Sequence, residues 1–228
     1  MRRLLIAVAA IVAVVMMAGV ASAKLIGLKG QLGYPDINFD NTGTISYTAS
    51  SGSFVLDADD WKIAYADGSV DYLTGPGFMT DIKIYLTVDK NGNLVSGTMV
   101  EKVVEGSVTV SGNTYSAGTI LLSGTVVAFG WGEGDNLGDF DFLISKDSLS
   151  GALVNDGIWP TTWPTGIVAY AENLNGWAGS WDSDFELYKV KGDKAPVPEP
   201  TTLFLLGTGL IGLAGIWQRR LRKVKRKM

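Results

Sequence analysis

Residues 81–100 read DIKIYLTVDKNGNLVSGTMV, and this stretch decides the fold class. Polar and apolar side chains alternate from Asp81 to Val88, a pattern typical of a half-buried β-strand. Asp89–Asn93 follows with an Asn-Gly pair, which tolerates the positive φ of a type I′ hairpin turn. The stretch therefore predicts a strand that ends in a tight hairpin turn.

The same alternation recurs along the chain between Lys24 and Ala195. Further examples are Trp61–Tyr65, Ser107–Val110 and Gly138–Ile144. Turn signals such as Ala66–Ser69 and Ser111–Asn113 separate these runs roughly every 8–12 residues, and no window of that length shows a convincing helical stripe. We therefore expect an all-β domain, with a β-sandwich as the first choice and a closed antiparallel barrel as the second.

A short internal repeat favours a meander of hairpins. The dipeptide Ser-Gly recurs at Ser96, Ser123 and Ser150, with a constant step of 27 residues. Glycines at equivalent points of successive hairpins would mark bulges or close backbone approaches. Chance is an equally good explanation in a glycine-rich β chain.

Composition limits the functions open to this domain. Lys24–Ala195 is long enough for one domain with a sizeable core, and it holds 22 acidic against 10 basic residues, a net charge of −12. That charge argues against nucleic acid and anionic lipid as partners. The chain has no cysteine and no histidine, which excludes disulfides, zinc bound by those residues and nucleophilic catalysis with a histidine base.

The N-terminus has the features of an export signal. Arg2 and Arg3 precede an uncharged run that extends from Leu4 to Ala21. Ala21 and Ala23 then form the small-residue site at which a secretory signal peptide is cleaved. We therefore expect residues 1–23 to be a signal peptide and residues 24–195 to be the exported domain.

The C-terminus carries an apolar segment at residues 201–217. As a helix this segment would rise about 25 Å, against a hydrocarbon core of about 30 Å, so it predicts a marginal single transmembrane helix. A buried core helix is the alternative. Seven basic residues follow and should hold that end in the cytoplasm. They are Arg219, Arg220, Arg222, Lys223, Lys225, Arg226 and Lys227.

The residues before that segment complete a three-part pattern: Val197, Pro198, Glu199 and Pro200. Because the two prolines lack the N–H needed for a helix or sheet, the motif should stay extended and accessible, although a plain linker would serve equally well mechanically. With the apolar segment and the basic tail at 218–228, residues 196–228 closely resemble a PEP-CTERM sorting signal of Gram-negative bacteria.

This resemblance implies a partner and a destination. The partner would be an exosortase, an integral-membrane cysteine transpeptidase that cleaves near Pro198–Pro200. The protein would pass through a single-span intermediate in the inner membrane and reach the cell surface or the extracellular matrix, with a link to exopolysaccharide and biofilm. The same C-terminal segment occurs on some proteins catalogued as ice-binding, which implies nothing about the exported domain.

Two groups of residues within the domain could bind a ligand. The glycine-rich stretch before one predicted strand offers oxygen ligands for calcium, and the sequence indicates no other cofactor. Its residues are Glu133, Asp135, Asn136, Asp139 and Asp141. Four tryptophans near prolines and polar residues could form a saccharide platform, although most such rings are core residues. They are Trp159, Trp163, Trp177 and Trp181.

Three functional classes remain open for the chain. A non-catalytic surface or matrix protein comes first, because the sorting signal is distinct and the catalytic inventory is poor. A membrane-anchored module that binds calcium or polysaccharide is the second. The third is a glycosidase with a carboxylate pair, such as Asp139 or Asp141 with Glu133, whose separation the sequence does not give.

Overall fold

The computed structural model of the chain describes residues 25–132 and 138–198. Within these ranges nearly all regular structure is β. The long strands are β1 (Asp36–Thr48), β2 (Ser53–Ala64), β4 (Met79–Val88), β5 (Leu94–Glu105), β8 (Ile120–Trp131), β9 (Asp139–Ile144), β10 (Thr165–Asn173) and β11 (Phe185–Pro196). The connections contain β3 (Val70–Tyr72), β6 (Ser107–Val110), β7 (Asn113–Ser116), a 3₁₀ turn at Lys146–Ser148 and the short helix α2 (Ala152–Asn155).

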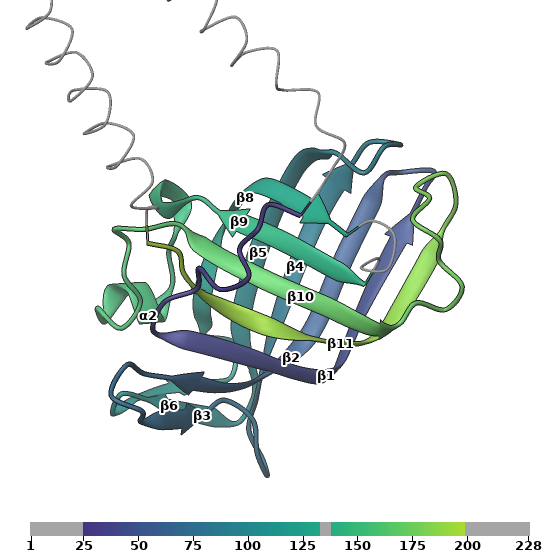
Figure 1. Ribbon diagram of the computed structural model, residues 1–228. Helices are drawn as coiled ribbons and strands as arrows, with labels where there is room; N and C mark the ends of the chain where they lie inside the picture. The colour runs from purple at the N-terminus through teal and green to yellow at the C-terminus, as the bar shows by residue number, and fades with distance from the viewer. Residues whose placement is uncertain (1–24, 133–137, 199–228) are drawn as a thin grey trace, which may run out of the picture. The chain divides into compact units, whose positions relative to one another are not determined.

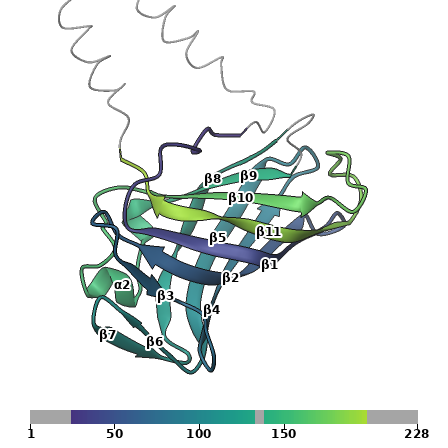
Figure 2. The ribbon, with the colours of Figure 1, turned by 60° about the horizontal axis from the view of Figure 1, so that its bottom comes forward.

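The eight long strands close into an antiparallel up-and-down barrel (Figures 1 and 2). Its order is β1-β2-β4-β5-β8-β9-β10-β11, and β1 completes the ring by pairing with both β2 and β11. A sandwich would consist of two separate sheets with edge strands, whereas this ring has none. The β-sandwich that we expected first is therefore wrong, and the antiparallel barrel is confirmed.

Strand β1 can close the ring because it bends. Its register shifts between Phe39 and Gly43 against β11, and between Phe39 and Thr44 against β2. Bulges of this kind bend a strand and increase its twist, as closure of a barrel requires. The backbone comes close to its neighbours there, since a Cβ added at Gly43 would lie 2.8 Å from the Cβ of Ala58.

Alternation along the strands separates the barrel interior from its surface. In β4 the inward residues Ile82, Ile84 and Leu86 are at most 3% exposed, whereas Tyr85 between them is 46% exposed. The alternation seen in Asp81–Val88 is thus the alternation of barrel interior and solvent. The burial of the inward set is the main source of stability for such a domain.

The predicted turns form, with one difference in type. Between β6 and β7, Ser111 and Gly112 both have positive φ, as a two-residue type I′ turn requires. Between β4 and β5 only Gly92 has positive φ, and Gly92 N–H donates to the Asp89 carbonyl. The Asp89–Asn93 turn is therefore longer than the type I′ turn suggested by its Asn-Gly pair.

The barrel has two chemically different ends. Alternate connections of a meander lie at the same end of the barrel, so one end carries the turns 49–52 and 89–93 and the loop 174–184. We call this end the aromatic end. The β2–β4, β5–β8 and β9–β10 connections lie at the opposite end, with β3, β6, β7 and α2 (Figure 2). There Tyr115 of β7 donates a hydrogen bond of 2.5 Å to Asp156, which follows α2.

The Ser-Gly repeat does not mark three equivalent hairpins. Ser96 lies in β5 and Ser123 in β8, but Ser150 lies outside the named strands and forms an isolated bridge with Ser123. The hydroxyl groups of Ser123 and Ser150 are 2.8 Å apart. Two copies of the repeat, at Ser123 and Ser150, are therefore in contact, whereas Ser96 pairs with Thr87 of β4.

Some expectations concern residues outside the described ranges. The signal peptide at 1–23, the transmembrane helix at 201–217 and the basic tail at 218–228 all lie there. In residues 25–132 and 138–198, no helix has the length and apolar character needed to cross a membrane.

Candidate functional site

The last strand of the barrel leads directly into the Pro-Glu-Pro motif. β11 ends at Pro196, and Val197 N–H donates to the Pro164 carbonyl at 2.8 Å. Val197 is 6% exposed, and its side chain covers Gly166 together with those of Leu28 and Leu32. Our expectation that the motif is accessible throughout is wrong at Val197, which is packed on the barrel. Pro198 is exposed, and Glu199 and Pro200 lie outside the described residues.

An N-terminal strap, residues 25–35, holds this junction. It crosses the outer face of β9 and β10 (purple in Figure 1), and Gly33 N–H donates to the Pro196 carbonyl at 2.8 Å. Asp141 Oδ2 accepts the N–H groups of Gly27 at 2.8 Å and Leu28 at 3.3 Å. Asp141 therefore fastens the strap to β9, while Gly33 ties it to Pro196 at the junction with the sorting motif.

This role bears on the calcium hypothesis. Asp139 and Asp141 do share one face of β9, as expected, but Asp141 already accepts two backbone hydrogen bonds. Burial raises the pKa of Asp141, which disfavours the ionised form that calcium requires. Glu133, Asp135 and Asn136 lie outside the described residues, and the described part of the chain holds no group of three acidic, His or Cys side chains able to bind a metal.

The four tryptophans do not form a single platform. Trp159 is 1% exposed and donates through its indole N–H to Thr165 Oγ1 at 2.9 Å. Trp159 and Trp163 precede β10, whereas Trp177 and Trp181 follow it, so the two pairs lie at opposite ends of a nine-residue strand. Of the four rings, Trp163 is the most exposed, at 37%. A shared saccharide surface would need all four on one side.

Trp177 and Trp181 belong to the aromatic end of the barrel. Trp181 stacks edge-on against Tyr47, with ring centroids 5.0 Å apart, and packs against Phe54 and Phe129. A Cβ added at Gly92 would lie 2.5 Å from the Trp181 indole nitrogen and 2.6 Å from that of Trp131. The hairpin tip thus rests on both indoles, and only glycine fits there.

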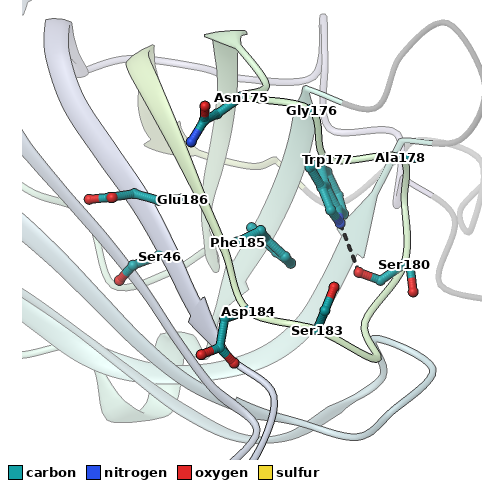
Figure 3. A pocket seen from close by; sticks show the side chains of 10 residues that line it. All are labelled: Ser46, Asn175, Gly176, Trp177, Ala178, Ser180, Ser183, Asp184, Phe185 and Glu186. Atoms are coloured by element: carbon teal, nitrogen blue, oxygen red, sulfur yellow. Dashed lines mark hydrogen bonds between the residues drawn. The ribbon is translucent and has the colours of Figure 1, made fainter.

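A surface groove of about 670 Å³ opens beside this aromatic end (Figure 3). Trp177 and Phe185 line it, and Trp177 donates its indole N–H to the Ser180 carbonyl at 2.9 Å, shown as a dashed line. Asp184 and Glu186 add two carboxylates, and no lysine or arginine is among the lining residues. The groove therefore combines hydrogen-bonding groups and ring edges with negative charge, which suits neutral or cationic ligands.

A second acidic group lies near the start of β1. Asn38 Nδ2 donates to Asp193 Oδ1 at 2.6 Å and to Asp36 Oδ2 at 3.2 Å, so it bridges the two carboxylates. Burial and the neighbouring Asp193 carboxylate raise the pKa of Asp36 to about 6. The native state therefore binds this proton more tightly than the unfolded chain does.

We expect Asp36→Asn to stabilise the barrel above pH 6. Because the folded pKa is raised, wild-type stability falls as pH rises from about 4 to about 6, and the variant lacks this loss. The shift corresponds to at most about 3 kcal/mol, and solvent screening of a partly exposed group reduces the expected gain to about 1 kcal/mol. Urea denaturation at pH 4 and pH 7.5 measures it. Asp147→Asn, at an 81% exposed side chain, is the control, and an equal gain at both pH values would contradict the prediction.

Comparison with known families adds the decisive observation about the C-terminus. The model of the PEP-CTERM protein-sorting motif matches residues 196–220. The chain carries a PEP-CTERM sorting motif. The resemblance seen at Val197–Pro200 is thereby confirmed, and the motif indicates exosortase-dependent sorting toward the cell surface. The PEP-CTERM match begins at the last residue of β11 and leaves the barrel uncovered. No curated protein and no solved structure matches the chain.

The sequence did not reveal one further group: the buried side chains of Asp60, Glu101 and Lys194. A signal was present in β5, where Glu101 is in phase with the inward residues Met99 and Val103. The alternation of β5 alone therefore predicts that the Glu101 carboxylate points into the barrel.

Proposed function

We propose that this protein is a non-catalytic component of the bacterial cell surface or extracellular matrix, exported and then sorted by an exosortase. The observation that carries the proposal is the PEP-CTERM motif at residues 196–220. The fold supports this proposal, because the last strand of the barrel ends at Pro196, where the sorting motif begins. A Gram-negative host and a single-span intermediate in the inner membrane are part of the proposal.

We further propose that the barrel associates with exopolysaccharide or biofilm, with the groove beside Trp177 as the point of contact. Its polar side chains and ring edges support such a ligand, while Asp184 and Glu186 disfavour polyanionic polysaccharides. A non-catalytic role is supported by the engagement of Asp141, which accepts strap N–H groups and is poorly placed to act in a glycosidase pair. The alternative is a membrane-anchored module that binds calcium or polysaccharide and keeps its C-terminal tail.

The mass and location of the mature protein test the proposal. Native host cells with and without the exosortase gene would be separated into inner membrane, cell surface and extracellular matrix. We expect a chain that begins at Lys24 and ends near Pro198–Pro200 in the surface or matrix fraction, together with polysaccharide, and only when the enzyme is present. An intact chain that ends at Met228 in the inner membrane of both strains would favour the anchored module instead.

A further inference from the structure

Three charged side chains meet inside the barrel. Asp60 of β2, Glu101 of β5 and Lys194 of β11 are each 0% exposed. Lys194 Nζ hydrogen-bonds Glu101 Oε2 and lies 3.5 Å from Asp60 Oδ1. The apolar residues Ile37 and Phe39 of β1, opposite Lys194 and Asp60 in the register, are at most 3% exposed and help to exclude water.

The trio is unbalanced as an ion pair. It contains two carboxyl groups and one ammonium, and neither oxygen of Asp60 accepts a hydrogen bond from the described residues. Burial, with the nearby Glu101, raises the pKa of Asp60 well above its ordinary value, so Asp60 is the neutral acid of the pair. Glu101 accepts the hydrogen bond from Lys194 and is the base. An amine, a base and a neutral carboxylic acid are thus held together in the buried interior of the barrel.

We propose that Lys194 and Asp60 join in a spontaneous isopeptide bond inside the barrel, with Glu101 as the base that accepts a proton from Lys194. The reacting groups are already positioned, since the nucleophilic nitrogen is 3.5 Å from an oxygen of the acid, and such placement replaces an encounter in solution. The neutral acid is the electrophilic form, because an ionised carboxylate repels an attacking amine.

The step balances without any other reactant. Lys194 gives one proton to the Glu101 carboxylate, and the free amine attacks Cγ of Asp60. The C–N bond forms as the C–O bond to the Asp60 hydroxyl breaks, and that hydroxyl leaves as water with a second proton from the nitrogen. The third proton stays on the amide, and Glu101 ends neutral. No oxidation or reduction occurs.

The bond would remove the electrostatic problem of the trio. The buried ammonium and the buried carboxylate are both neutralised, so no charge stays in an apolar interior where charges are costly. The bond would also join β2 to β11, which are the two neighbours of the closing strand β1. A chain without cysteine would thereby gain a covalent cross-link at the closure point of its barrel.

Peptide mapping of the mature full chain tests the proposal. After trypsin digestion we expect residues 30–62, which contain Asp60, to be joined to the peptide that begins at Gly192, with a mass one water below their sum. Cleavage after Lys194 should be absent. If the wild-type protein instead yields an unlinked 30–62 peptide and normal cleavage after Lys194, that result alone overturns the proposal. The exposed pair Lys191 and Glu172 is an internal control that should stay unlinked.

Two variants assign the roles. Asp60→Asn should still form the link but should lose ammonia in place of water, which would identify residue 60 as the acyl donor. Loss of water in this variant would mean that Glu101 is the acyl donor and would overturn the proposal. Glu101→Gln should yield folded barrel, by near-ultraviolet circular dichroism of the aromatic end, without the link. A complete link in Glu101→Gln would show that Glu101 is not the base and would overturn that part of the proposal.

Discussion

Replacing Lys194 with methionine should destabilise the barrel by about 3–5 kcal/mol, the usual cost of removing one partner from a buried charge pair. Lys194 is 0% exposed and faces Asp60 and Glu101, so the variant leaves two buried carboxyl groups without a cation. Where the proposed amide has formed, the variant instead loses the cross-link between β2 and β11 and leaves the Asp60 and Glu101 carboxyl groups buried without a partner. Urea denaturation followed by tryptophan fluorescence measures the change.

The pH dependence separates the charge effect from loss of packing. Burial already raises the pKa of Asp60 and Glu101, and without Lys194 the main interaction that opposes this rise is lost. Groups whose folded pKa is raised destabilise the native state as pH rises above the unfolded value of about 4. The deficit of Lys194→Met should therefore be greater at pH 8 than at pH 5.

Lys191→Met is the matched control for the lysine prediction. Lys191 lies on the same strand, and its Nζ pairs with Glu172 on the outer surface of the barrel. Solvent screens such pairs, so its removal should leave the unfolding midpoint nearly unchanged. Equal losses for the two variants would mean that the buried trio has no special importance for stability.

Local features of the fold could be predicted from the sequence, because they depend on neighbours in the chain. Alternation predicted β4, β6 and β9 with ends within two residues of those observed, and turn residues located the turns that follow β4 and β6. Ring closure depends on β1 meeting β11, which is separated from it by most of the domain. The bulge between Phe39 and Gly43 that permits this has no distinct sequence signal, and so the sandwich and the barrel could not be ranked correctly.

The residues of the candidate site show the same division. The sorting motif is a contiguous pattern and was recognised without a structure. The tryptophans were grouped by residue type, but β10 separates Trp159 and Trp163 from Trp177 and Trp181. Asp60, Glu101 and Lys194 come from three strands, and only the completed ring brings them together. Residue types suggest chemistry, but closure of the barrel decides which of them meet.

Trp181→Ala should cost about 3–5 kcal/mol of stability, the range typical of truncating a buried aromatic side chain. Trp181 is 3% exposed, and its ring packs against Tyr47, Phe54, Phe129, Trp131, Trp177 and Phe185. Its loss leaves a cavity beneath the hairpin tip at Gly92, which rests on the indole. Thermal and urea unfolding both report the change.

Trp163→Ala is the matched control, because the same truncation is made at a ring that is 37% exposed and has no stacking partner among the described residues. We expect it to change stability far less than Trp181→Ala does. The comparison also determines how a loss of saccharide binding should be interpreted. In Trp181→Ala such a loss would follow from collapse of the aromatic end. In Trp163→Ala, which we expect to stay folded, it would indicate direct contact with the saccharide. Similar stabilities for the two alanine variants would contradict a structural role for Trp181 and return its ring to the list of ligand-binding groups.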